Sequence, residues 1–282
     1  MYRYCWLLMF LYPSFITAGV VSCVDSEGKK IFTDKTYLCV GVGEPKEVEI
    51  ETGNFHSQFG LTVSKEYRNY AFRAYKKLDG FELELIVEKA LYDADPELAI
   101  AAAKKLEANT LEALALLPKH SRNSFSDIRY YIFIGDESRT GGRHGGQWYF
   151  RESDSMPDRF DNSIVVRSAK DYLTRYKGAR PVQTAVHELS HAYYYYNIKE
   201  SYYQNKKAYE SALEHRLYLN VKYKNGGIRK KAYALKNNRE YFAEISKIYF
   251  AGSPYYPFNR QQLKDYDPQG YAVVESVWGI AN

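Results

Sequence analysis

The chain has 282 residues, of which 45% are hydrophobic and 26% charged, and its formal net charge is +5. This length allows one large domain, or one domain and a small module, with a sizeable buried core. Because the net charge is small, it does not indicate nucleic-acid binding, and we expect no nucleic acid as a partner. The 29 tyrosines are more typical of half-buried packing than of a binding surface.

Residues 1–22 have the features of a signal peptide. Arg3 supplies a positive charge, residues 5–18 form an apolar run, and small residues follow as far as Ser22. The run is shorter than the roughly 20 apolar residues of a transmembrane helix. We therefore expect the mature chain to be secreted, or to reside at the cell surface or in the periplasm, with no transmembrane span.

Two cysteines, Cys23 and Cys39, follow this segment. An oxidising compartment favours a disulfide between them. The alternative is that residues 20–23 form a lipoprotein signal, with Cys23 as a lipid anchor and Cys39 free. Neither cysteine has the spacing of a metal ligand.

Residues 23–65 are expected to form a β-rich module or arm, because 29–34 and 47–51 alternate polar and apolar residues between glycines. The remainder, 66–282, is expected to form the main domain. Its predicted strands are 81–87, 129–135, 147–151 and 163–167, and its predicted helices include 98–117, which begins at Asp95 and Pro96, and 169–176.

Two further segments of the main domain carry no specific signal. The glycine-rich loop 141–146 contains His144, which we interpret as a surface residue. Residues 206–231 are interpreted as a connector with loops, and a basic rim of a substrate cleft is the alternative for the lysines there.

Residues 187–191 read His-Glu-Leu-Ser-His, within a segment from Pro181 that predicts a helix. Histidines four residues apart lie on one helical face, so His187 and His191 are expected to share a tetrahedral metal ion. Glu188 lies about 100° around the helix, beside the open coordination position. This spacing predicts two metal ligands and a general base.

The third ligand is predicted in residues 238–245, Asn-Arg-Glu-Tyr-Phe-Ala-Glu-Ile. Glu240 and Glu244 share one helical face, and inward-facing carboxylates are costly unless they are paired or bind metal. A solvated acidic face is the alternative. We predict Glu240 as the third ligand, with Glu244 accepting the other ring N–H of a ligand histidine.

His-Glu-x-x-His followed by Glu-Tyr-Phe-Ala-Glu resembles the zincin metallopeptidases of the anthrax lethal factor and Pro-Pro endopeptidase type. The likeness covers about residues 80–279 and is greatest to secreted bacterial members. These share a Tyr-Pro-Phe stretch, here 256–258, an Asp-Pro helix start at 267–268 and a terminal Trp-Gly at 278–279. The four tyrosines 193–196 depart from the family pattern.

The resemblance implies an α+β fold with a small mixed sheet and active-site helices, and Zn²⁺ as the cofactor. It also implies that Tyr233, seven residues before Glu240, stabilises an oxyanion, and that Asn237 assists the metal ligands without binding the metal itself. The expected function is a zinc endopeptidase spanning 66–282, with a protein or peptide substrate extended along the strand at 147–151.

Two other functions stay open. The protein could be a non-catalytic zinc-containing surface or adhesion protein, or an amidase that acts on cell-wall peptides. A structural zinc site requires neither Glu188 nor Tyr233, so their presence favours an enzyme.

Overall fold

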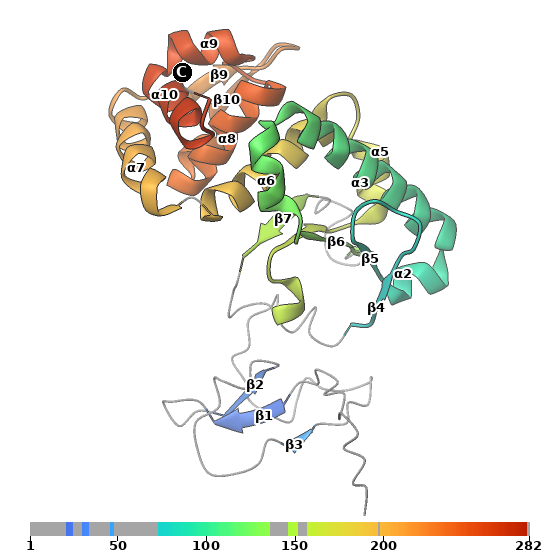
Figure 1. The fold of residues 1–282 in the computed structure, drawn as a ribbon. Coiled ribbons are helices and arrows are strands. Elements are labelled where there is room, and N and C mark those ends of the chain that lie inside the picture. Colours follow the sequence, from blue (N-terminus) through green and yellow to red (C-terminus); the bar gives the residue numbers. More distant parts are fainter. Residues whose placement is uncertain are drawn as a thin grey trace, which may run out of the picture. The chain divides into compact units, whose positions relative to one another are not determined.

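Figure 1 shows the computed structural model, which describes residues 21–24, 30–33, 46–47, 73–135, 146–151, 157–196 and 198–280. The chain divides into two compact units, Met1–Phe72 with Asp154–Asp158, and Arg73–Ser153 with Arg159–Asn282. The predictions for the signal segment, Cys39 and His144 fall outside the described residues.

The first unit contains a small antiparallel sheet in the order β2-β1-β3. Its strands are β1 (Val21–Val24), β2 (Lys30–Thr33) and β3 (Lys46–Glu47). Cys23 lies in β1, in register with Ile31. Strand β2 lies within the predicted strand 29–34, β3 shares only Glu47 with the predicted strand 47–51, and β1 was not predicted.

A five-stranded mixed sheet in the order β4-β5-β6-β8-β7 forms one half of the second unit. Its strands are β4 (Tyr75–Lys77), β5 (Leu85–Glu88), β6 (Arg129–Ile132), β8 (Ser163–Val166) and β7 (Gln147–Phe150). The three central strands are parallel, and β4 and β7 pair antiparallel at the two edges. The four predicted strands are confirmed, and β4 was not predicted.

Side chains on β6 show how the two faces of the sheet are filled, because successive residues of a strand point to opposite faces. Tyr131 packs edge-to-face on Tyr75 and Phe160, and all of these rings lie in one aromatic cluster. Tyr130 is buried with the residues of the helical face. Figure 1 shows α3, α5 and α6 on the same side of the sheet.

Helix α3 (Pro96–Leu116) begins as predicted, with the Asp95 side chain accepting a hydrogen bond from the Leu98 N–H at 2.9 Å. Its buried residues are mostly small and recur at helical spacing, namely Ala99, Ala102, Ala103, Leu106, Thr110 and Ala113. Small side chains allow close approach of a neighbouring helix, and α3 packs against α5 (Ala169–Arg175) and α6 (Arg180–Tyr196).

The other half of the second unit is mostly helical (Figure 1). Its elements are α7 (Ile198–Glu214), β9 (Leu219–Lys222), β10 (Ile228–Lys231), the 3-10 turn η4 (Tyr233–Leu235), α8 (Asn238–Ala251), α9 (Arg260–Tyr266) and α10 (Pro268–Val277). The interpretation of 206–231 as a loop-bearing connector is therefore wrong, because this region holds the second half of α7 and the β9–β10 hairpin. The remaining helical elements are α2 (Lys89–Ala94), η2 (Lys119–Phe125) and η3 (Asp158–Phe160).

Helices α6 and α8 pack against each other, and Trp278 contacts residues of both helices. The Trp278 ring is fully buried, stacks on Tyr193 with the centroids 4.0 Å apart, and donates a hydrogen bond from Nε1 to Ser246 Oγ at 3.0 Å. Tyr194 packs on Phe242 of α8. Tyr193 and Tyr194 thus pack between these two helices, whereas Tyr195 contacts Tyr149, Arg151 and Arg239.

Within the described ranges, no helix combines the length and the apolar character needed to cross a membrane.

Candidate metal centre

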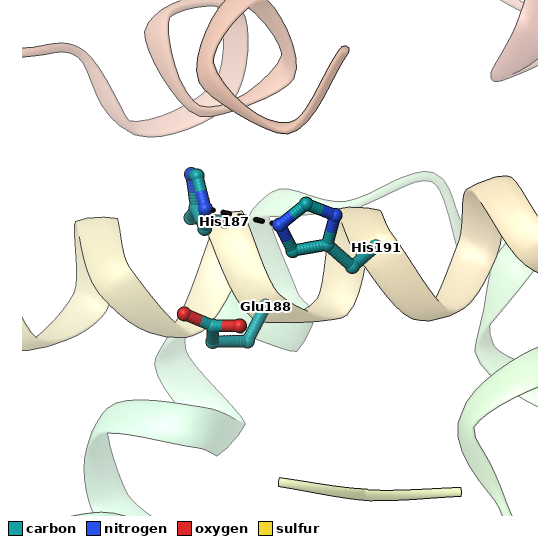
Figure 2. A group of neighbouring side chains, drawn as sticks. All are labelled: His187, Glu188 and His191. Carbon is teal, nitrogen blue, oxygen red and sulfur yellow. Dashed lines mark hydrogen bonds between the residues drawn. The ribbon is translucent and has the colours of Figure 1, made fainter. Parts of the chain in front are cut away.

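Helix α6 carries His187, Glu188 and His191, with the two imidazoles next to each other and the Glu188 side chain on another side of the helix (Figure 2). The helix buries Ala185, Val186 and Leu189 on its apolar face. The two imidazoles then stand one helical turn apart, with Nε2 of His187 3.2 Å from Nε2 of His191. The predicted pairing of these two side chains is present in the structure.

Glu240 reaches the same point from α8. Its Oε2 lies 3.2 Å from His187 Nε2 and 3.1 Å from His191 Nε2. The three potential donor atoms therefore form a nearly equilateral triangle. For Zn–N and Zn–O bonds of about 2.0–2.1 Å, tetrahedral ligand atoms are separated by about 3.3 Å, so the triangle matches one face of such a site.

The start of helix α8 positions Glu240, and the neighbouring hydrogen-bond donors keep its carboxylate ionised. Asn237 caps α8, and its Oδ1 accepts hydrogen bonds from the N–H groups of Arg239 at 3.0 Å and Glu240 at 2.9 Å. Glu240 lies in the first turn, where the helix dipole favours a negative charge. Burial raises the pKa of Glu240, but His187 and the other nearby hydrogen-bond donors outweigh it and hold this pKa well below its ordinary value. Asn237 thus acts on the centre through the helix start and not by touching a histidine ring.

Glu244 stands behind His187, one turn further along α8. Its Oε1 lies 2.9 Å from His187 Nδ1, an ion-pair distance without the alignment of a full hydrogen bond. Buried Lys247 contacts the same oxygen at 2.5 Å, and the Tyr255 hydroxyl donates to Oε2. Burial raises the pKa of Glu244, but Lys247 and His187 lower it overall, so the carboxylate is ionised. An ionised Glu244 fixes the proton of His187 on Nδ1 and leaves Nε2 free to bind a metal.

The two histidines differ in their protonation without metal. Burial lowers the pKa of His191. Burial also disfavours the charged form of His187, but Glu240 and Glu244 more than offset this and raise the pKa of His187 to about 9. Metal binding at neutral pH would therefore displace a proton from His187.

Glu188 points away from the ligand triangle, toward the edge of the sheet. Its Oε2 accepts a hydrogen bond from the Tyr149 N–H of β7 at 2.8 Å. Burial raises the pKa of Glu188 to about 7, although His187 and the Tyr149 N–H act in the opposite direction. A carboxyl group with a pKa near neutrality is suited to accept and return a proton.

Tyr233, in η4, lies at the side of the site opposite the sheet edge. Its hydroxyl donates to Glu240 Oε1 at 3.0 Å and accepts from Lys236 Nζ at 2.8 Å. Lys236 Nζ also donates to Glu240 Oε1 at 2.9 Å. Burial raises the pKa of Tyr233, so the hydroxyl keeps its proton at neutral pH. The side chain is 38% exposed, which leaves room for it to turn toward a ligand.

These groups face a cavity of about 530 Å³. Its lining includes six of the seven predicted site residues, namely His187, Glu188, His191, Tyr233, Glu240 and Glu244, and does not include Asn237. It also includes strand β7, the N-terminal part of α6, and the cations Arg180, Lys236 and Lys247. The donor triangle thus faces a cavity large enough to hold part of a peptide.

The residues that the sequence analysis missed are Lys236, Lys247 and Tyr255. Lys247 lies three residues after Glu244 within α8, so helical spacing offered a signal for it. Lys236 precedes the start of α8, so helical spacing offered no signal for it. Tyr255 follows α8 by several residues, and no local pattern indicates that it returns to Glu244.

The donor set, two imidazole nitrogens and one carboxylate oxygen, fits a divalent zinc ion. Among the described residues, His187, Glu188 and His191 also have potential ligand atoms within 4.8 Å of one another. We assign the carboxylate ligand to Glu240 because its Oε2 lies 3.1–3.2 Å from both imidazoles, whereas Glu188 Oε2 accepts a hydrogen bond from the Tyr149 N–H. Comparison with protein-family models, with curated proteins and with solved structures finds no match. The conclusions on function therefore depend on the residues and their geometry.

Proposed function

We propose that the protein is a secreted zinc-dependent endopeptidase with a zincin-type catalytic domain. The observation that carries this proposal is the convergence of His187 Nε2, His191 Nε2 and Glu240 Oε2, separated by 3.1–3.2 Å, on a cavity that also holds Glu188 and Tyr233. The mixed sheet, with its edge strand β7 against the histidine helix, supports the same assignment.

His187, His191 and Glu240 would hold the zinc ion. When bound, zinc would act as a Lewis acid that polarises the scissile carbonyl and increases the acidity of water. Glu244 would orient His187 for this role.

The chain's own residues would carry the proton transfers. Glu188 would accept a proton from the attacking water and deliver it to the departing amine nitrogen. The Tyr233 hydroxyl would leave Glu240 and donate a hydrogen bond to the oxyanion that develops on the scissile carbonyl. Lys236 would remain on Glu240 Oε1 and so keep this carboxylate partnered while Tyr233 moves.

An extended substrate would lie along the outer edge of β7, which lies beside α6. The Tyr149 N–H on this edge is already donated to Glu188. A substrate strand would therefore use the neighbouring main-chain groups of β7 or displace this bond, which would free Glu188 to move toward the attacking water.

Two alternatives remain to be separated by experiment. A purely structural zinc site closes its fourth position with another protein ligand, whereas this donor triangle faces a cavity. An amidase that acts on cell-wall peptides would use the same catalytic residues. Only the substrate distinguishes it from an endopeptidase.

The test compares wild type with Glu188→Gln on casein, a peptide library and peptidoglycan, with and without chelator. We expect zinc-dependent peptide cleavage by wild type and a loss of about 100-fold or more in Glu188→Gln, at unchanged zinc content. Glu214→Gln, at the exposed end of α7, is the matched control and should behave as wild type. Near wild-type turnover in Glu188→Gln would reject the proposed base, and cleavage of peptidoglycan alone would favour the amidase.

A further inference from the structure

Although the net charge of the whole chain is only +5, residues 215–239 form a strongly basic segment. Residues 215–239 contain no aspartate or glutamate. They contain eight lysines and arginines, namely Arg216, Lys222, Lys224, Arg229, Lys230, Lys231, Lys236 and Arg239. The segment includes the β9–β10 hairpin and η4, and it ends immediately before the ligand Glu240.

The hairpin lies against the residues that support the metal centre. The Lys224 N–H donates to the Pro254 carbonyl at 2.9 Å, and Tyr223 forms an antiparallel bridge with Tyr255. Tyr255 in turn donates its hydroxyl to Glu244 and contacts the backbone of Tyr233. The hairpin is therefore linked through Tyr255 to Glu244 and Tyr233, which line the cavity, although none of the described hairpin residues lines the cavity itself.

Strand register identifies which cations share that face. Residues opposite each other in an antiparallel pair point to the same side, and the side alternates along each strand. Arg229 pairs with Val221, which is buried, and its guanidinium lies over the Tyr255 ring, 5.3 Å from the centroid. Lys231 has the same parity as Arg229, and Lys222 has the opposite parity.

We call Arg229, Lys231 and Lys236 the basic wall. Lys236 lines the cavity and forms an ion pair with Glu240. Among the described residues, no other cation of residues 215–239 forms an ion pair at salt-bridge distance. In the part of the chain that the structure describes, Arg229 donates hydrogen bonds to two neutral partners, Tyr223 Oη at 3.3 Å and the Lys231 carbonyl at 3.1 Å, and its charge also interacts with that of Glu244. Lys231 is exposed. These cations are thus positioned to attract charge from a ligand.

The cavity adds to this bias. Its three carboxylates, Glu188, Glu240 and Glu244, are formally balanced by Arg180, Lys236 and Lys247. A bound divalent metal would then make the cleft positive, and the basic wall would extend that potential along one side.

We propose that the cleft selects acidic peptides, with aspartate or glutamate side chains of the substrate lying against the basic wall. This inference rests on the proposed endopeptidase function and specifies its substrate class. Complementary charge at the rim of a site acts mainly on encounter and binding, and it weakens as salt screens the charges. The preference should therefore appear in KM more than in kcat and decline with ionic strength.

The experiment begins with a peptide-library digest by the zinc-loaded wild type, and continues with synthetic peptides based on the best-cleaved sequence. In these peptides each acidic residue is replaced by glutamine or lysine. We expect acidic residues to be enriched near the cleaved bond, and the lysine peptides to show a KM about five- to tenfold higher. Lys231→Glu should abolish or reverse the preference.

Two variants with the same change of charge serve as controls. Lys222→Glu alters the opposite face of the same hairpin, and Lys207→Glu alters an exposed position on α7. Both should keep most of the acidic preference. If Lys231→Glu behaves as these controls do, or if the cleavage sites show no acidic enrichment, the inference is wrong while the endopeptidase assignment stands.

A binding measurement separates failure of this inference from failure of the proposed function. Zinc-loaded Glu188→Gln is titrated with fluorescent acidic, neutral and basic peptides, and with vesicles containing an anionic lipid. Binding of acidic peptides that depends on Lys231 supports the inference even if wild type cleaves nothing. Equal binding of all peptides, together with vesicle binding that depends on Lys231, would assign the wall to a membrane surface and overturn it.

Discussion

Tyr233 and Lys236 both donate hydrogen bonds to Oε1 of Glu240. One of these donors is enough to keep Oε1 hydrogen-bonded while Oε2 faces the histidines. The arrangement allows Tyr233 to leave without stranding the charge. We predict that Tyr233→Phe retains zinc and lowers kcat by about 100- to 1000-fold, the range expected for a lost oxyanion donor. The measurement is steady-state kinetics combined with zinc analysis.

Tyr203→Phe is the matched control, because Tyr203 is 73% exposed on α7. It should leave both kcat and zinc content unchanged. If Tyr233→Phe also loses its zinc, the hydroxyl is needed to hold Glu240, and its assignment to the oxyanion is not supported.

Glu244 is the second residue whose role can be isolated. Glu244→Gln should weaken zinc binding by about 10- to 100-fold, because His187 loses the charge that fixes its tautomer. The same change leaves Lys247 as a buried cation without its counter-charge, which is expected to destabilise the fold by several kcal/mol. Zinc affinity, measured with a competing chelator, and thermal unfolding report these two effects separately.

The double variant Glu244→Gln/Lys247→Met removes both buried charges. It should recover much of the stability, while zinc affinity stays as weak as in the single variant. Recovery of zinc affinity together with stability would show that Glu244 acts only through folding.

At the scale of elements, the start of α8 sets the position of Glu240. Asn237 accepts hydrogen bonds from two N–H groups of the first turn, so Asn237→Ala should lower the free energy of unfolding by about 1 kcal/mol. Asn237→Asp should restore it, and Asn238→Ala serves as the control. Denaturant unfolding of the metal-free protein measures this, and an unchanged midpoint in Asn237→Ala would contradict the capping role.

Local sequence patterns predicted α3, α6, α8 and the central strands because each carries its own signal. Asp95 and Pro96 mark a helix start, and His187 and His191 are spaced by one helical turn. Strand β9, Leu-Asn-Val-Lys, alternates apolar and polar residues over only four positions, and β10, Ile-Arg-Lys-Lys, does not alternate. Positive φ angles occur at Arg216 and Tyr218, just before the hairpin, and at Asn220 within β9. The position of the two strands depends on pairing with each other and with the segment at Tyr255, which is tertiary information.

The same distinction applies within the site. His187, Glu188, His191, Glu240 and Glu244 were predicted from spacing or resemblance, and the structure brings them together. Tyr255 was not identified, and a basic rim was named only as an alternative for the lysines of 206–231, because the place of both in the site follows from how the hairpin packs on the segment after α8. The substrate class is accordingly an inference from the structure and not from the sequence.

For the whole molecule, the donor triangle exists only when α6 and α8 are packed together. Its donor groups lie 53 residues apart along the chain from His187 to Glu240, and Trp278, near the C-terminal end, packs on residues of both helices. If the protein binds zinc as proposed, binding would be coupled to folding, and we expect zinc to raise the melting temperature of the protein.

The protonation of the metal-free site gives this coupling a pH dependence. His187, with a pKa of about 9, is protonated at pH 8, whereas zinc requires its neutral form. The metal-free state thus binds one proton more than the zinc-bound state. Zinc affinity should rise by about tenfold per pH unit near pH 8 and level off above pH 9.

Calorimetric titration of the metal-free protein with zinc between pH 7.5 and 8.5 tests the central claim most directly. We expect one zinc ion per chain, release of about one proton, and much weaker binding by Glu240→Ala but not by the control Glu214→Ala. No binding, or equal binding by wild type and Glu240→Ala, would contradict the convergence of His187, His191 and Glu240 on one metal ion.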